Sequence, residues 1–134
     1  MEAVADLPVR VERCTLEPRA FETPRFTRHT TVVVLSGGDC SGSGEDVTYT
    51  EADQLAHRAL APFALAGEDT LAGWSRRLDD VALFDGEPEE GAARDYRRWV
   101  YESALLDLGL RQAGTTLGAL LGREPRPVRF CVSS

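Results

Sequence analysis

Residues 94–108 read RDYRRWVYESALLDL, and this stretch decides the fold. Apolar side chains lie around nearly the whole circumference of the helix that it predicts, which is typical of a helix buried on most sides. We expect this helix to run from about Ala92 to Ala113, where Gly114 ends it. One helical stripe is expected to pack on the strands that precede it, and this stripe comprises Trp99, Ser103, Leu106, Leu110 and Ala113.

The chain beyond Gly114 predicts a short helix and then a strand. Thr115 or Thr116 caps the short helix, which reaches Leu121 and ends at Gly122. The sequence VRFCVS at 128–133 has the apolar character of a buried strand. A complete domain rarely stops inside such a strand, so the pattern indicates the front part of a larger protein. We expect residues 1–124 to form one domain and residues 125–134 to begin the first strand of the next.

Three strands are predicted ahead of the helices. The first, Pro8–Leu16, alternates apolar and polar residues, and the second, Thr30–Leu35, is rich in β-branched residues. The third, Cys40–Glu45, contains glycines that permit a close backbone approach. Loops are predicted at Glu17–Arg28 and Asp46–Thr50. Helices are then expected to begin at Thr50 and Thr70. The first of them is expected to continue through Leu55 and Phe63, which should face the long helix or its neighbours in the core. The predicted fold class is α+β, a three-stranded antiparallel meander followed by a helical bundle.

Composition excludes several classes of protein. The formal net charge of -7 argues against a sequence-independent nucleic-acid binder, because neutralising phosphates requires a basic face. No apolar run approaches the roughly 20 residues of a membrane span, and the N-terminus lacks the features of a signal peptide. The three cysteines, Cys14, Cys40 and Cys131, form no CxxC pair. Reduced thiols in a cytoplasm are therefore favoured over a disulfide scaffold or a zinc site.

Few side chains offer catalytic chemistry. The chain has no lysine, so it has no amine for a Schiff base, a P-loop or a lysine general base. Gly38-x-Cys40-x-Gly42 has the spacing of a nucleophile elbow, but that motif requires a strand-turn-helix corner, and a glycine-rich hairpin is favoured here. We expect His29 and His57 to have structural roles.

Charged residues on the long helix and in the preceding loop have ordinary explanations. Glu102 and Asp107 each lie four residues from an arginine and are expected to form ion pairs along the helix. Residues 85–90, DGEPEE, lack the ligand spacing of a calcium loop and are expected to be a solvated loop. No metal-binding residue is therefore predicted in this chain.

The order and spacing of these pieces carry a family resemblance. They include GSGE at 42–45, ESALLDL at 102–108, Gly114 and LLG at 120–122. The chain resembles the N-terminal capping domain of the enolase superfamily, in the branch of mandelate racemase and muconate-lactonising enzyme. In that family a Leu-Leu-Gly turn leads into the first strand of a (β/α) barrel, which residues 128–133 match. The resemblance implies that the rest of the barrel is absent from this chain.

The resemblance implies an isomerase or lyase, such as an epimerase, a cycloisomerase or a dehydratase. The complete enzyme would remove a proton next to the carboxylate of a small substrate, and Mg²⁺ would stabilise the enediolate. The metal ligands and the bases would lie on barrel strands, where such enzymes carry their active sites. We therefore expect no catalytic residue, metal or cofactor in this chain, and no activity from the chain alone.

The resemblance also implies that two loops close over the barrel mouth and shape the substrate pocket. They match Glu17–Arg28 and Asp46–Thr50. Specificity pockets combine apolar walls with a few directed polar groups, so the candidates for substrate binding are Arg19, Phe21, Arg25, Phe26, Thr48 and Tyr49. An arginine in such a loop would hold a distal carboxylate with two parallel hydrogen bonds. The alternative is that the two phenylalanines only anchor the loop to the strands.

Other functions remain open at this point. One alternative is that the chain is a free-standing, non-catalytic interaction module that docks on a separate barrel subunit. Another is that it is a truncated gene product. Homo-oligomers are also open, because an unpaired apolar strand at residues 128–134 offers free backbone groups with which another chain can pair. A third possibility is a small hydrolase that uses Cys40 as its nucleophile. No membrane or nucleic-acid partner is expected.

Overall fold

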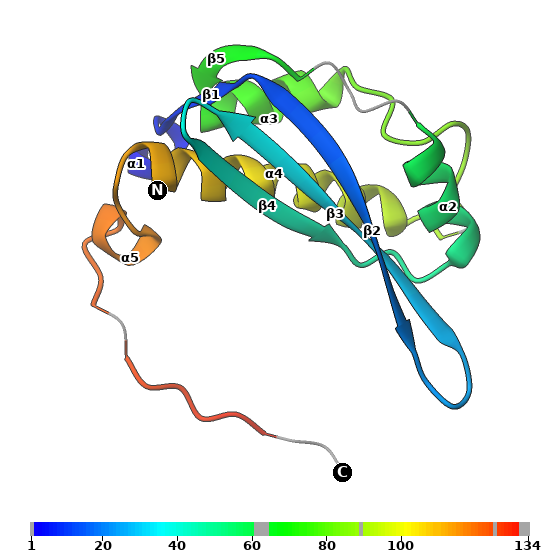
Figure 1. Cartoon of the computed structure of the whole chain (residues 1–134). Coiled ribbons are helices and arrows are strands. Elements are labelled where there is room, and N and C mark those ends of the chain that lie inside the picture. Colours follow the sequence, from blue (N-terminus) through cyan, green and yellow to red (C-terminus); the bar gives the residue numbers. More distant parts are fainter. Residues whose placement is uncertain (1, 61–64, 89, 125, 132–134) are drawn as a thin grey trace.

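The computed structural model describes residues 2–60, 65–88, 90–124 and 126–131 of the 134-residue chain (Figure 1). The elements of the described residues follow in the order α1 (Glu2–Ala5), β1 (Pro8–Val11), β2 (Arg13–Glu22), β3 (Thr27–Gly37), β4 (Cys40–Asp46), α2 (Glu51–Ala59), β5 (Gly67–Thr70), α3 (Leu71–Asp79), α4 (Ala93–Gln112) and α5 (Leu117–Leu120). Strands come first and most helices follow, which confirms the α+β class.

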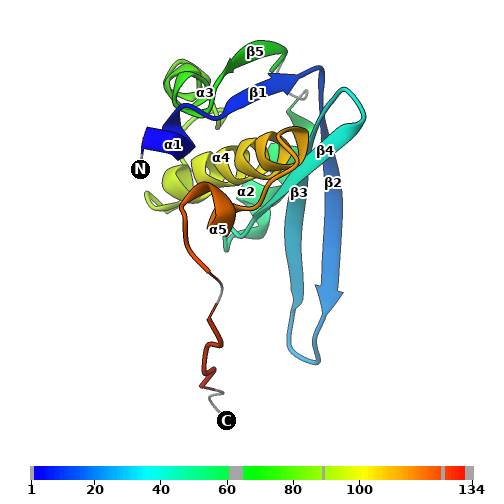
Figure 2. The ribbon, with the colours of Figure 1, turned by 90° about the vertical axis from the view of Figure 1, so that its left-hand side faces the viewer.

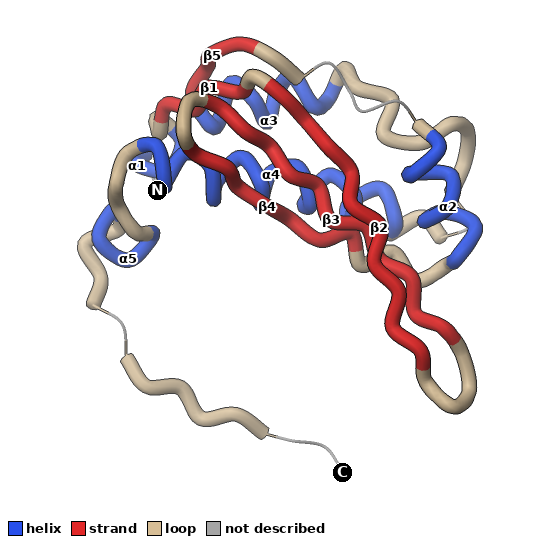
Figure 3. Tube along the Cα trace, viewed as in Figure 1, coloured by secondary structure: helices blue, strands red, loops and turns tan. Residues whose placement is uncertain are grey.

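An antiparallel sheet in the order β2-β3-β4 forms one layer, and α4 crosses one of its faces (Figures 1 and 3). This sheet confirms the predicted three-stranded meander. A second, two-stranded antiparallel sheet pairs β1 with β5 beside α3. The second sheet holds the N-terminal segment against the segment that leads into α3, where the Leu71 N–H also donates to the Leu7 carbonyl at 2.8 Å.

The prediction of a single strand over Pro8–Leu16 is wrong. The chain changes partner at Glu12: β1 pairs with β5, whereas β2 pairs with β3 from Arg13 onward. The Glu12 N–H already donates to the Ser36 carbonyl at 2.7 Å, so the change takes one residue. The partner strand β5 reads GEDT, which has little intrinsic preference for a strand. Only tertiary pairing makes it one.

The helix α4 presents a different face to the sheet from the one predicted. Its buried residues include Val100, Tyr101, Ala104, Leu105 and Leu108, which pack on Val33 and Leu35 in the main hydrophobic core. The predicted stripe points away from the sheet, so that Trp99 is 63% exposed and Leu106 is half-buried. Since both faces are apolar, periodicity alone did not distinguish them. Leu55, also predicted to face the core, is 49% exposed on α2.

The glycines of β4 allow α4 to lie almost against the strand. A Cβ atom built on Gly42 would be 2.2 Å from the Leu108 nitrogen, and one built on Gly44 would be 2.1 Å from the Val100 carbonyl oxygen. No side chain fits in such a space. The prediction that these glycines permit a close backbone approach is confirmed.

The segment predicted as a loop, Glu17–Arg28, is mostly a long hairpin. The strand β2 continues to Glu22 and β3 begins at Thr27, so only the tip lies between them. Thr23 closes this tip: its hydroxyl donates to the Phe26 carbonyl at 2.6 Å and accepts from the Phe26 N–H at 3.0 Å. The hairpin extends beyond the body of the domain (Figures 1 and 2).

The later helices largely follow the prediction. Thr70 and Thr116 cap α3 and α5 by accepting from the N–H groups of Gly73 and Ala119, at 3.1 and 3.2 Å. The helix α2 ends at Ala59, and Phe63, which was expected to continue it, lies outside the described residues. No helix of the described residues is long and apolar enough to cross a membrane.

The C-terminal segment that was predicted to be a strand forms none in residues 126–131, and residues 132–134 lie outside the described part. Its apolar side chains are exposed, at 72% for Val128 and 86% for Phe130. The segment runs away from the domain after α5 (Figure 1). Within the described residues it therefore contributes nothing to the core.

Candidate functional site

A cavity of about 530 Å³ lies between the outer part of the β2–β3 hairpin and the turn that follows β4. Its lining comprises Phe21, Thr23, Phe26, Thr27, Arg28, His29, Tyr49 and Glu51. The hairpin supplies six of these residues, and the segment at the start of α2 supplies the other two. The two segments lie at least 20 residues apart in the sequence, and the fold brings them together.

Antiparallel register places an aromatic ring and a cation together on the hairpin. Phe21 pairs with Arg28 across β2 and β3, and residues directly opposite each other project on the same face. Phe21 and Phe26 are 69% and 61% exposed, so neither is anchored in the core. Their exposure disfavours a purely structural role, because an anchoring aromatic residue would be buried.

Arg28 fastens the turn after β4 to the hairpin. Its guanidinium donates to the Val47 carbonyl at 2.7 Å and to the Tyr49 carbonyl at 3.4 Å. The same group stacks over the Tyr49 ring, 4.3 Å from its centroid, in a cation–π arrangement. The Tyr49 ring is otherwise 73% exposed. The arginine therefore orients the aromatic side chain that forms one wall of the cavity.

His29 and Glu51 form the polar side of the cavity. The His29 Nε2 atom lies 3.1 Å from the Glu51 carboxylate, and this contact is an ion pair only when the imidazole is protonated. His29 Nδ1 is buried and has no hydrogen-bond partner in the described part of the chain. The pair joins β3 to the first turn of α2.

The inner side of the same turn is held by a buried carboxylate. Asp46 Oδ1 accepts hydrogen bonds from the Thr48 N–H at 3.0 Å and from the Thr48 hydroxyl at 2.6 Å. Gln54 donates its side-chain amide to the carbonyls of Asp46 and Thr48, at 2.9 and 3.1 Å. All three side chains are almost fully buried. The turn that carries Tyr49 is thus fixed from inside and, through Arg28, from outside.

Asp46 also connects the turn to α2 and α4. Its Oδ2 atom lies 2.8 Å from His57 Nδ1 and accepts from Arg97 Nε at 3.1 Å, and these side chains are fully buried. A carboxylate can only accept, so Nδ1 of a neutral His57 carries the proton, and Nε2 accepts from the Tyr101 hydroxyl at 2.9 Å. With a neutral imidazole, the charges of Asp46 and Arg97 cancel within the core.

The pKa values of this cluster agree with that assignment. Burial alone raises the pKa of Asp46, but the hydrogen bonds from His57 and Thr48 and the charge of Arg97 outweigh it, so the pKa is lowered to about 2. Burial lowers the pKa of Arg97, and the Asp46 carboxylate opposes this effect. Burial raises the pKa of Tyr101, so its hydroxyl stays protonated and donates a hydrogen bond to His57. The predicted structural role of His57 is confirmed.

The six residues predicted to bind substrate divide into two groups. Phe21, Phe26 and Tyr49 line the cavity. The other three do not: Arg19 pairs with Glu17 at 2.8 Å, Arg25 lies at the hairpin tip, and Thr48 is buried against Asp46. Arg28, His29 and Glu51 also line the cavity and were not among the predicted residues. Because Glu17–Arg28 was predicted as a loop, no strand register was available to place Arg28 opposite Phe21.

Cys40, the alternative nucleophile, does not lie in the strand-turn-helix corner that a nucleophile elbow requires. Cys40 begins β4 directly after the Gly38-Asp39 turn, so the motif connects two strands and not a strand and a helix. Its side chain packs partly against the hydrophobic core. The expected helix ion pairs are present, with Arg98 to Glu102 at 3.0 Å and Arg111 to Asp107 at 2.9 Å.

The cavity is suited to recognition. Three aromatic rings provide stacking surfaces, Arg28 provides a positive charge, and His29 with Glu51 provides a polar edge. Ligand sites commonly combine apolar walls with a few such polar groups. In the described ranges, no group of three or more His, Cys, Asp or Glu side chains is arranged to hold a metal ion.

Comparison with known proteins gives one match. A family model described as "Domain of unknown function (DUF8230) N-terminal domain" matches residues 2–120, which extend from α1 to the end of α5. No curated protein and no solved structure matches the chain.

Proposed function

Since the chain belongs to the DUF8230 N-terminal domain family, whose function is unknown, we propose that it is the substrate-specificity capping domain of an enzyme resembling the enolase superfamily. A (β/α) barrel that follows it in the polypeptide would carry out the reaction. In this proposal the chain contributes binding and not catalysis. The complete enzyme would remove a proton next to the carboxylate of a small substrate.

One observation carries the proposal. Two separate segments were expected to shape a substrate pocket, and Phe21 and Phe26 of one line the same cavity as Tyr49 of the other. An antiparallel meander with a helix packed on it further supports a capping domain of this kind. The family description also names an N-terminal domain, which agrees with a further domain that follows.

The chemistry of the cavity favours a substrate with a flat apolar group at its far end. Phe21, Phe26 and Tyr49 offer ring faces, and such contacts add about 0.5–1.5 kcal/mol per aromatic pair beyond area burial. A second carboxylate is less favoured than the sequence suggested, because Arg19 already pairs with Glu17 and Arg28 donates to two carbonyls. We therefore propose a small carboxylate that carries an aryl group.

The resemblance implies Mg²⁺, but the described residues of this chain do not fit it, since they contain no cluster of three or more candidate ligands. We propose that any such ion is held by the barrel. The role of this chain is then to close one side of the pocket, exclude water and orient the distal group of the substrate.

The test uses the full-length gene product and competing carboxylate substrates with aromatic or short aliphatic side chains. Phe21→Ala and Tyr49→Ala should change the ratio of kcat/KM between the two substrate classes and leave the melting temperature nearly unchanged. Tyr49→Phe keeps the ring and should retain the ratio. Leu55→Ala removes an exposed apolar side chain outside the cavity and serves as the matched control.

Two results would refute the proposal. One is an equal loss of activity on all substrates together with a lower melting temperature, which would make these aromatic residues structural. The other is a reading frame that ends close to residue 134, which would favour the free-standing interaction module.

A further inference from the structure

The polar edge of the hairpin cavity contains a carboxylate with unused hydrogen-bonding capacity. Glu51 lies in the first turn of α2, and its side chain is 65% exposed. Its Oε1 atom lies 3.1 Å from His29 Nε2, and no other side chain of the described residues pairs with it. A carboxylate has two oxygens, and both of them accept hydrogen bonds. Glu51 can therefore accept a further hydrogen bond from a ligand in the cavity.

His29 holds this carboxylate in place and leaves its charge intact. With a neutral imidazole, Nε2 carries the proton and donates to Glu51, because a carboxylate can only accept. The contact joins β3 to α2, so the position of Glu51 is tied to the strand that carries Arg28. The cavity thus has a negatively charged acceptor whose position is defined by the fold.

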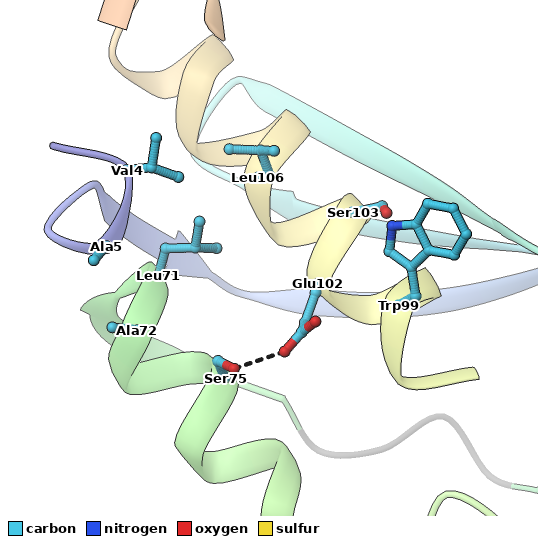
Figure 4. Close-up of a pocket in the computed structure, with 9 residues that line it drawn as sticks. All are labelled: Val4, Ala5, Leu71, Ala72, Ser75, Trp99, Glu102, Ser103 and Leu106. Atoms are coloured by element: carbon cyan, nitrogen blue, oxygen red, sulfur yellow. Dashed lines mark hydrogen bonds between the residues drawn. The ribbon is translucent and has the colours of Figure 1, made fainter. Parts of the chain in front are cut away.

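Another groove of the domain contains a carboxylate that lacks this capacity (Figure 4). The groove has a volume of about 590 Å³ and lies between α1, α3 and α4. Its carboxylate, Glu102, accepts from the Ser75 hydroxyl at 2.6 Å and from Arg98 Nε at 3.0 Å. The arginine compensates the charge of Glu102. Of these two carboxylates, Glu51 is therefore the one with a charge and an oxygen left for a ligand.

A positive charge lines the hairpin cavity as well. The Arg28 guanidinium donates to the carbonyls of Val47 and Tyr49, and it pairs with no carboxylate of the described residues. Carbonyl groups are neutral, so these bonds leave the charge of Arg28 uncompensated. A cationic ligand group is attracted by Glu51 and repelled by Arg28, and the reverse holds for an anionic group. A neutral hydrogen-bond donor is accepted by Glu51 and avoids both repulsions.

We propose that the hairpin cavity selects a hydroxyaryl group and that Glu51 accepts the hydrogen bond from its hydroxyl. Such a bond to a carboxylate is charge-assisted and is stronger than one between neutral groups. An aryl group without a donor would displace water from Glu51 and leave it unpaired, which disfavours that ligand. The inference deepens the proposed function and rests on it only for the placement of an aryl group in this cavity.

The test measures binding and requires no reaction. The 134-residue chain is titrated at pH 8 with 4-hydroxyphenylacetate and with 4-fluorophenylacetate, whose fluorine is similar in size to the hydroxyl and cannot donate. Amide chemical shifts of residues 47–51 report occupancy of the cavity. The hydroxy ligand should bind about tenfold more tightly than the fluoro ligand. A third ligand, 4-carboxyphenylacetate, should bind more weakly than the fluoro ligand, because Glu51 repels its second carboxylate.

Two variants assign the preference to Glu51. Glu51→Ala should weaken binding of the hydroxy ligand to the level of the fluoro ligand, leave the fluoro ligand unchanged and strengthen binding of the dicarboxylate. Glu22→Ala is the matched control, because it removes an exposed carboxylate of the hairpin that does not line the cavity. This variant should retain the order of the three ligands. A loss of fold would weaken all three ligands alike and is thereby distinguished from a loss of the hydrogen bond.

Equal affinity for the hydroxy and fluoro ligands, with binding that disappears in Tyr49→Ala, would overturn the inference and leave the proposed aryl cavity standing. A preference that persists in Glu51→Ala would place the acceptor elsewhere and would also overturn it. Tightest binding by 4-carboxyphenylacetate would make Arg28 the selecting group, with the same consequence. Absence of binding by all three ligands would overturn the inference, and the proposed function would still be decided by the kinetic comparison in the full-length product.

Discussion

Gly44 lies so close to α4 that a Cβ atom built on it would be 2.1 Å from the Val100 carbonyl oxygen. Gly44→Ala should therefore push the helix away from the sheet and lower the free energy of unfolding by about 2 kcal/mol or more. The measurement is urea unfolding followed by circular dichroism. Gly91→Ala is the control, because a Cβ atom there meets nothing within 4 Å. Equal stability of the two variants would contradict the close packing.

Asp46 should make the domain sensitive to acid. Its pKa is lowered to about 2 in the folded chain from the usual 3.8, so its ionised form stabilises the fold above about pH 4. That contribution, of about 2 kcal/mol, should be lost as the pH falls from about 4 to 2. Asp46→Asn should be less stable at neutral pH, and the difference from the wild type should shrink over this range. A difference that stays constant from pH 5 to 2 would place the stabilisation elsewhere.

Tyr101→Phe should destabilise the domain, although it keeps the aromatic ring in the core. The substitution removes the hydroxyl that donates to His57 Nε2 at 2.9 Å and leaves a buried acceptor without this donor. Such a loss costs about 1–3 kcal/mol. Thermal unfolding measures it, and Tyr96→Phe, at a half-buried position on the same helix, is the control. Equal melting temperatures for the two variants would show that the bond contributes little.

Arg28→Ala should loosen the turn that carries Tyr49 without unfolding the domain. The variant loses the donors to the Val47 and Tyr49 carbonyls and the cation stacked on the Tyr49 ring. Amide hydrogen exchange of residues 47–50 should become faster, while exchange in α4 stays unchanged. Arg25→Ala, at the tip of the hairpin, is the comparison variant. Slow exchange retained in Arg28→Ala would mean that Asp46 and Gln54 suffice to fix the turn.

The cysteines should react in an order set by their surroundings. Burial raises the pKa of the Cys14 thiol to about 11, so it has little thiolate at neutral pH, whereas Cys131 is exposed. Iodoacetamide at pH 8 should modify Cys131 first and Cys14 only after unfolding. Peptide mass spectrometry identifies the modified sites. Modification of Cys14 under native conditions would show that β2 opens readily.

Local sequence signals predicted the features that depend on short-range interactions or on a single residue type. Thr70 and Thr116 cap their helices by short-range hydrogen bonds, and the glycines at 42 and 44 mark a close approach whatever the partner. In both cases the deciding interaction lies within a few residues or follows from one residue type. The two segments that line the hairpin cavity were instead indicated by the family resemblance, which implied that Phe21, Phe26 and Tyr49 shape a substrate pocket.

Tertiary structure alone decided which surfaces meet. β5 is a strand only because β1 pairs with it, and α4 buries Val100 and Leu108 and not Trp99 because Gly42 and Gly44 admit that face. The cluster of Asp46, His57, Arg97 and Tyr101 joins residues up to 55 positions apart, and no local pattern predicted it. The physical reason is that apolar periodicity specifies how much of a helix is buried, whereas the shape and hydrogen-bonding groups of the partner specify which face.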